Sequence, residues 1–135
     1  MSGDALATSF EALLTGFTVY KGAVPKAPTY PHVLVLTNFP TPSERSMART
    51  ASVLALRSRT VVVGLTPASV RIIAQKLSDV LEGKRLTVTG WNLGAIESVP
   101  NEQPIFHDRD VIIPNTSDSP FYQTFDWILT GSPTT

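Results

Sequence analysis

Hydrophobic and polar residues follow their most regular pattern in residues 59–89, where the sequence predicts a strand, an amphipathic helix and a second strand. Thr66 is suited to cap the helix and Pro67 to its first turn, while Gly83 suits the left-handed residue that follows its end. One face of the helix is apolar and comprises Val70, Ile73, Ala74, Leu77, Val80 and Leu81. Such a helix is expected to pack on an apolar surface.

Two short β-branched segments flank this helix, at residues 60–63 and 86–88. We expect both to belong to the sheet on which the helix packs. The first lies within residues 52–63, which mostly favour β structure but are interrupted by polar residues at 57–59. One long bent strand and a tight hairpin both fit this segment.

The rest of the chain contains one further predicted helix and several predicted strands. Residues 4–14 place apolar side chains at helical spacing, whereas residues 17–20, 32–37 and 111–113 favour strands and 32–37 reads as a buried one. Residues 121–129 alternate with a period of two, which predicts a half-buried strand with its aromatic face inward. This order predicts an α+β fold in which one long helix and an N-terminal helix accompany a mostly antiparallel sheet.

Proline and polar residues mark the connections. Residues 23–31 contain three prolines and predict an extended loop. Residues 40–49 are polar, include Arg45 and Arg49 and lack an apolar period, so we expect a mobile loop there. The polar residues 131–135 predict a short flexible tail.

The length of 135 residues predicts a single domain with a core at about residues 5–130. The chain has no cysteine, which excludes disulfides, thiolate nucleophiles and Cys-ligated zinc. The formal net charge is zero, but residues 1–85 carry ten basic and five acidic residues, whereas residues 86–135 carry one and six. The net charges of the two parts are thus +5 and −5. Head-to-tail pairing of copies and scattered solvated charges both fit this division.

Nothing in the sequence predicts contact with a membrane. The N-terminal segment contains Asp4 and lacks a basic region, so it does not resemble a signal peptide. The longest apolar runs, such as residues 33–36 and 61–65, are far shorter than the roughly 20 residues that cross a bilayer. We therefore expect a soluble protein.

Candidate catalytic chemistry is confined to His107, Asp108 and Asp110, which precede a predicted strand. Neighbouring side chains in an extended chain point in different directions, so a solvated turn fits this spacing better than a metal site or a general base. The strand-to-helix junction at residues 64–67 has no nucleophile elbow, and no glycine-rich phosphate loop occurs. We predict no cofactor and no enzymatic activity. His32 is interpreted as a boundary or core histidine.

A sparse basic stretch contains Arg45, Arg49, Arg57 and Arg59. It could face a phosphate backbone, but dedicated nucleic-acid-binding proteins are usually basic overall, and this chain is neutral. A basic loop that stays solvated, or that pairs with acidic residues of a neighbouring subunit, fits better. Sequence-specific DNA recognition is therefore not predicted.

The order of predicted elements resembles the tail terminator proteins of long-tailed bacteriophages. The resemblance rests on a strand ending in a turn at residues 63–67, a helix end with the Leu-x-Gly-x-Arg-Leu pattern at 81–86, an Asp-rich segment at 108–110 and a Pro-Phe-Tyr strand start at 120–122. It covers most of the chain. The sequence departs from the family pattern in a lengthened segment at residues 43–59, where loop and strand are difficult to assign.

The resemblance implies an α+β subunit that forms a hexameric ring at the head-proximal end of the tail tube. Such a ring ends tube polymerisation and joins the tail to head-completion proteins, and no catalytic residue belongs to that role. Its partners would be other copies of itself, the tail tube protein and a head-completion or stopper protein, while DNA passes through the lumen without sequence-specific binding. The protein would assemble in the host cytoplasm and reside in the neck of the virion.

The resemblance also suggests where contacts occur. The predicted loop at residues 40–49 would face the lumen or an axial partner, with Arg45 and Arg49 ordering on docking. Inter-subunit charge contacts would involve Arg57, Arg59, Asp108 and Asp110.

Three other functions remain open at this stage. A head–tail stopper is a related neck component, but it would have more β structure and less helix. A small enzyme would bring His107 and Asp108 or Asp110 together in a concave pocket. A generic binding domain would remain monomeric.

Overall fold

Two long strands, β4 (Ala51–Gly64) and β8 (Phe121–Pro133), form the antiparallel centre of the sheet. The computed structural model describes residues 3–16, 18–24, 29–38, 41–45, 51–99, 104–109, 111 and 119–133. The register of β4 and β8 runs from Leu54 opposite Gly131 to Gly64 opposite Phe121. Every other described strand except β1 pairs directly with one of these two.

On one side of β4, β2 (His32–Thr37) pairs with its second half and β3 (Thr41–Arg45) with its first half. Strand β1 (Val19–Lys21) runs parallel to β2 and forms one edge. On the far side of β8 lie three short strands, β5 (Trp91–Leu93), β6 (Glu97–Val99) and β7 (Phe106–His107). All described pairings except β1–β2 are antiparallel, which confirms the prediction of an α+β fold with a mostly antiparallel sheet.

The long helix α2 (Pro67–Leu81) begins and ends as its sequence predicts. The Thr66 hydroxyl accepts a hydrogen bond from the Ser69 amide at 3.1 Å, and the Ser69 hydroxyl accepts one from the Thr66 amide at 3.2 Å. Pro67 occupies the first turn, where its missing N–H costs nothing. Gly83 follows the helix with a φ of 75°, the left-handed conformation that glycine adopts without strain.

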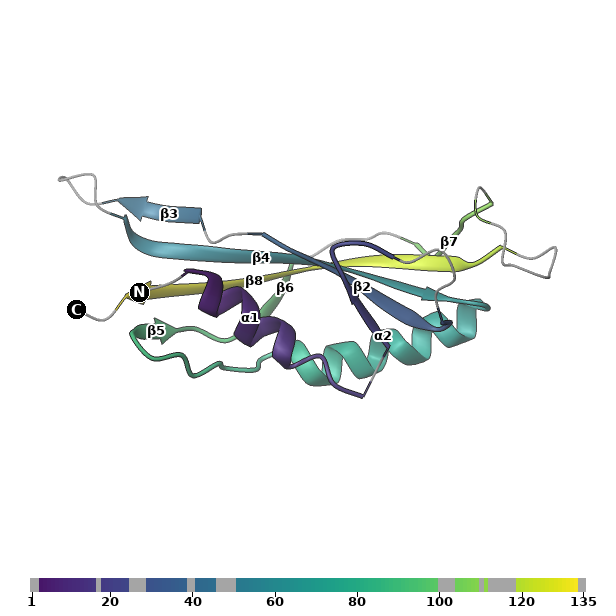
Figure 1. Cartoon of the computed structure of the whole chain (residues 1–135), viewed down its shortest axis with the longest axis horizontal. Coiled ribbons are helices and arrows are strands. Elements are labelled where there is room, and N and C mark those ends of the chain that lie inside the picture. The colour runs from purple at the N-terminus through teal and green to yellow at the C-terminus, as the bar shows by residue number, and fades with distance from the viewer. Residues whose placement is uncertain are drawn as a thin grey trace.

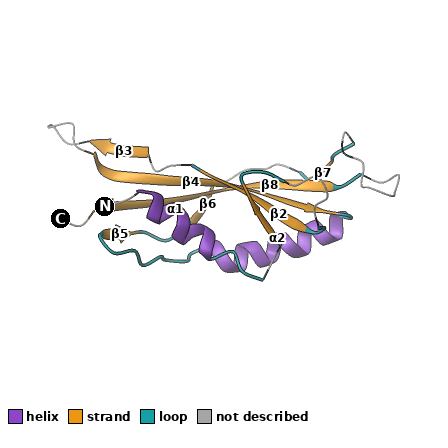
Figure 2. Ribbon diagram, viewed as in Figure 1, coloured by secondary structure: helices purple, strands orange, loops and turns teal. Residues whose placement is uncertain are grey.

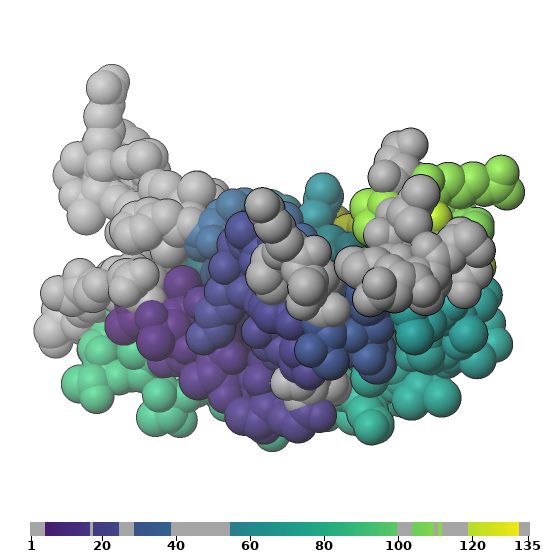
Figure 3. Space-filling model, turned by 45° about the vertical axis from the view of Figure 1, so that its right-hand side comes forward, coloured from purple at the N-terminus to yellow at the C-terminus, as the bar shows by residue number. Residues whose placement is uncertain are grey.

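The hydrophobic core lies between one face of the sheet and the two helices. Helix α1 (Gly3–Ala12) contributes Leu6 and Phe10, while α2 contributes Val70, Leu77 and Leu81. From the sheet come Val33, Val35, Leu56, Val62, Trp127 and Leu129. Figure 1 shows both helices on the same side of the sheet. In the space-filling view of Figure 3, the N-terminal segment in purple lies beside the blue of β2. The apolar stripe of α2 and the inward face of β8 are thus confirmed as core.

The structure differs from the sequence-based prediction at several connections. Residues 86–88 form no strand, and the chain instead makes an isolated bridge between Arg85, which precedes β5, and Ala95, which follows it. Residues 41–45, predicted as part of a loop, form β3 because the long β4 offers them a backbone ladder. Val111 lies outside any strand, and the rest of the strand predicted at 111–113 falls outside the described residues.

Strand β4 decides between the two alternatives for residues 52–63, and strand β8 corrects the predicted start of the flexible tail. Strand β4 runs unbroken through the polar residues 57–59, so the long strand is correct and the hairpin is not. Strand β8 continues to Pro133 and pairs there with β5, so it includes the first three residues of the predicted tail. In the described part of the chain, neither helix has the length and hydropathy that a membrane-spanning helix requires.

We predict that Leu77→Ala lowers the free energy of unfolding by about 2–5 kcal/mol, because Leu77 is fully buried and the change leaves a cavity. Ile72 lies on the same helix but is 58% exposed, so Ile72→Ala should change stability by less than about 0.5 kcal/mol. Urea unfolding of the two variants measures both values. Equal losses would show that the apolar stripe is not the core-facing side of α2.

Candidate functional site

The sheet has a second face on which no described helix packs. Ser58, Thr60 and Val62 of β4 are buried on the helix side, so Arg57 and Arg59 project from the opposite side. The strand register places Leu36 of β2, Asp126 and Ile128 of β8 on that same side. We call it the helix-free face, and Figure 2 shows the purple helices gathered on the other side of the orange strands.

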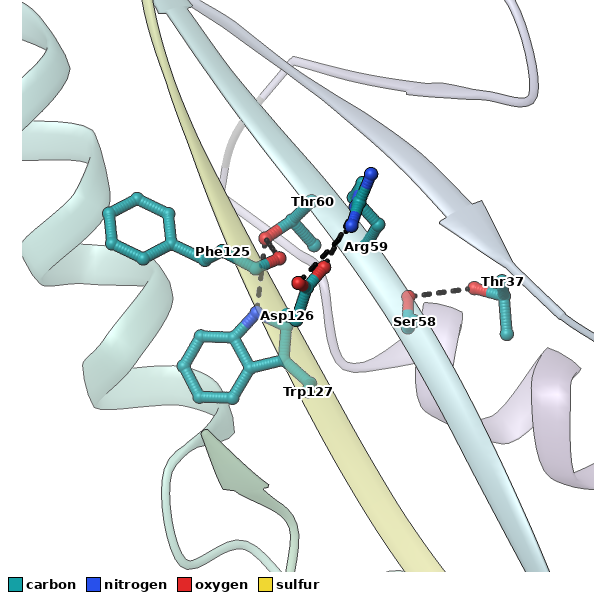
Figure 4. Close-up of polar contacts among 7 residues, drawn as sticks. All are labelled: Thr37, Ser58, Arg59, Thr60, Phe125, Asp126 and Trp127. Atoms are coloured by element: carbon teal, nitrogen blue, oxygen red, sulfur yellow. Dashed lines mark hydrogen bonds and ion pairs between the residues drawn. The ribbon is translucent and has the colours of Figure 1, made fainter. Parts of the chain in front are cut away.

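Arg59 and Asp126 form an ion pair across β4 and β8 on the helix-free face. The Arg59 Nε lies 2.9 Å from Asp126 Oδ1, and Arg59 Nη2 lies 3.3 Å from Asp126 Oδ2, so the contact is bidentate. The hydrogen bond and charge of Asp126 raise the pKa of Arg59. The Arg59 side chain is 58% exposed, so the pair adds little to stability. Its effect is to fix the orientation of the guanidinium (Figure 4).

An open hollow of about 450 Å³ lies beside this ion pair. It is lined by Leu36, Asn38, Arg57, Ser58, Arg59, Val99, Asp126 and Trp127. Arg59 and Asp126 neutralise each other there, and Arg57 makes no ion pair with any other residue that the structure describes. The lining therefore has one positive charge without an ion-pair partner among the described residues, and it also includes Leu36, an aliphatic side chain that is 38% exposed.

Buried and partly buried hydrogen bonds connect the strands beneath the hollow. The Trp127 indole Nε1 donates to Thr60 Oγ1 at 3.0 Å, and the Thr60 hydroxyl donates to the Phe125 carbonyl at 3.2 Å. Ser58 and Thr37 hydroxyls lie 3.0 Å apart and tie β4 to β2 (Figure 4). Because side chains alternate along a strand, the register fixed by Thr60 and Trp127 also places Arg59 opposite Asp126.

The structure brings together some of the residues singled out in the sequence and separates others. Arg57 and Arg59 lie on one surface, whereas Asp108 follows β7 near the other end of β8, with its amide donating to the Pro120 carbonyl at 2.8 Å. Arg45 is the last residue of β3. The side chain of Arg45, together with Arg49 and Asp110, lies outside the described residues.

The predicted catalytic or metal-binding cluster also includes His107, which belongs to β7. Its ring is exposed and stacks on Phe121 with centroids 4.3 Å apart. Among the described residues, no three His, Asp or Glu side chains gather as a metal site would require. Asp108 contributes instead to the electrostatics of Tyr30, whose pKa is raised first by burial and then by the Asp108 charge.

His32 is buried at the start of β2, as expected of a boundary or core histidine, and its register opposite Val63 places it on the helix-free face. Its Nδ1–H donates to the Thr29 carbonyl at 2.9 Å, and the rings of Tyr20 and Tyr30 lie 5.2 and 5.1 Å from its ring. Burial lowers the pKa of His32, and the hydrogen bond to Thr29 opposes that shift in part. The imidazole is therefore neutral at physiological pH.

Two residues of the site were not selected from the sequence. Asp126 was assigned to the outward face of its strand, but its pairing with Arg59 depends on a register between segments 67 residues apart. Leu36 was read as part of a buried strand, whereas Val33 and Val35 face the helical core and Leu36 on the other face is exposed. Residues 33–36 are all apolar, so no alternation in the sequence marks Leu36 as exposed.

Comparison of the sequence with models of known protein families gives no match, and comparison with curated protein sequences gives none either. The functional argument therefore depends on the chemistry of the helix-free face. The resemblance to tail terminators depends, as before, on the short motifs at residues 63–67, 81–86, 108–110 and 120–122.

We predict that Thr60→Val destabilises the protein by about 1–3 kcal/mol, because it leaves the buried Trp127 indole N–H without its acceptor. Thr124→Val makes the same chemical change on the helix-free face of β8 and should cost less than about 0.5 kcal/mol. Chemical unfolding monitored by tryptophan fluorescence compares the two. A negligible loss for Thr60→Val would mean that another group satisfies the indole.

Stability should fall as the pH is lowered through 6.5, the ordinary pKa of histidine, because the unfolded chain takes up a proton at His32 more readily than the folded one. The fall ends at the lower folded-state pKa. His32→Asn retains a donor for the Thr29 carbonyl and should remove this slope between pH 7.5 and 5.5. His107→Asn is the matched control and should retain it. Urea midpoints across this pH range test the prediction, and an unchanged slope in His32→Asn would contradict it.

Proposed function

We propose that this protein is a tail terminator subunit, which assembles as a hexameric ring on the head-proximal end of a phage tail tube. The observation that carries the proposal is the helix-free face, where Leu36 and Arg57 lie open to solvent on a sheet whose other face is covered by two helices. A subunit that buries only one face of its sheet retains a broad surface for a neighbouring subunit.

The chemistry of the hollow favours binding over catalysis. Its ionisable lining residues are two arginines and one aspartate, and arginine remains protonated at physiological pH. The aspartate is held in an ion pair by Arg59. Such a set of residues suits charge-assisted hydrogen bonds to a partner, whereas proton transfer near neutral pH needs a group that titrates there.

The extension made by β3 and β4 supports contacts along the axis of a ring. Residues Ala51 and Val53 of β4 pair with β3 and lie beyond the last residue of β4 that pairs with β8, Leu54. A two-stranded ribbon is marginally stable by itself, so packing against a partner would stabilise it. In the proposed ring, this extension contacts the tail tube protein, the head-completion protein or the DNA in the lumen.

The proposal predicts that the purified protein forms rings of six subunits, which native mass spectrometry and negative-stain electron microscopy would detect. The rings should bind the ends of tail tubes and stop the polymerisation of tube protein in vitro. A protein that stays monomeric at micromolar concentration, with no rings alone or on tubes, would overturn the proposal and favour a generic binding domain.

A pair of matched variants tests whether the helix-free face is used. Leu36→Asp places a charge on that face and should prevent ring formation. Ile72→Asp makes the same kind of change at an exposed position of α2 and should leave rings intact. Circular dichroism verifies that both variants fold. Rings in Leu36→Asp and none in Ile72→Asp would assign assembly to the helical side instead.

A further inference from the structure

We propose that the hollow on the helix-free face receives the segment containing Phe106 and Asp108 from a second copy of this chain. This inference rests on the self-assembly in the proposed function and names the two surfaces that meet. Each surface presents one exposed apolar side chain and one charged side chain without an ion-pair partner among the described residues, and the two charges have opposite sign.

The first of the two surfaces, the hollow that contains Arg57, is suited to bind a carboxylate. Arg57 is exposed in the hollow, while the neighbouring Arg59 is already held by Asp126 at 2.9 Å. Arg57 therefore remains available to donate two parallel hydrogen bonds to the carboxylate of another molecule. Leu36 lies in the same hollow and is 38% exposed, so an apolar group beside the carboxylate would find a matching contact.

The second surface, the segment that contains Phe106 and Asp108, has the complementary chemistry. Phe106 is 41% exposed on the short strand β7, where its ring lies 5.6 Å from the ring of Tyr122 and is thereby oriented. Asp108 follows two residues later, and its backbone is fixed by the hydrogen bond to Pro120. An exposed aromatic side chain and, two residues later, a partly exposed carboxylate thus lie on one segment that is anchored to the sheet by two paired residues.

These two surfaces cannot meet within one chain. Arg57 lies opposite Ile128 of β8, whereas Phe106 lies opposite Tyr122. From Tyr122 to Ile128 an extended strand rises about 20 Å. Contact therefore requires a second copy, and repeated head-to-tail contact of this kind closes a ring if the rotation per subunit allows it. If each of two copies offers both surfaces to the other, a closed dimer results.

Charge exchange between the two surfaces tests the contact. Arg57→Glu and Asp108→Arg should each weaken self-association at least about tenfold, and the double variant should recover to within about threefold of the native protein. Arg71→Glu makes the same charge change at an exposed position on α2 and should leave association unchanged. Analytical ultracentrifugation over a concentration series measures the native protein and the four variants, and thermal unfolding verifies their fold. If Asp108→Arg does not fold, Asp108→Asn should still weaken association.

Disulfide crosslinking provides a second measurement, because the chain contains no cysteine. Leu36→Cys combined with Phe106→Cys should give covalent multimers on mild oxidation, whereas Ile72→Cys combined with Phe106→Cys should remain monomeric on a denaturing gel. Crosslinking of the control pair to the same extent would show random collision and count against the contact.

The outcomes separate this inference from the proposed function. Rings that form normally in Arg57→Glu would overturn the contact and leave the tail terminator proposal standing. A native protein that is monomeric at all concentrations would overturn both. A closed dimer with rescue in the double variant would support the contact and overturn the ring.

Discussion

The pairing of β4 with β8 is the constraint on which the rest of this structure depends. The ladder aligns eleven residue pairs, and the remaining sheet elements are added to one of these two strands or to β2. On the inner face, it places Trp127 beside Thr60 in the core. On the outer face, the same register places Asp126 opposite Arg59. Core packing and the chemistry of the helix-free face are therefore two results of one alignment.

Much of the fold was predictable because its signals are local. Helix α2 has its cap, its first-turn proline and its terminal glycine in the sequence, and the period of two in residues 121–129 identifies both faces of β8. The prediction was wrong where structure depends on distant partners. Residues 41–45 are polar and contain a proline, yet they pair because β4 extends past β2 and offers them a free edge. Residues 86–88 favour β structure locally but form no ladder, and only the neighbouring Arg85 makes an isolated bridge, to Ala95.

The candidate site shows the same division between local and distant information. Composition and spacing identify Arg57 and Arg59 as exposed basic residues, but they do not distinguish the two. The difference arises because Asp126, far along the chain, lies opposite Arg59 and not opposite Arg57. An arginine with a partner positions a surface, whereas an arginine without one is available to bind. Sequence alone cannot make this distinction, since it requires the register.

The hollow is built from β2, β4, β6 and β8, which are widely separated in the sequence. Contacts over such separations form late and slowly during folding, because closing long loops costs entropy before any pairing is gained. A chain in which β8 has not yet docked has neither the floor of the hollow nor the carboxylate that orients Arg59. Any partner that recognised this surface would therefore recognise only the finished fold, in which both long strands are already paired.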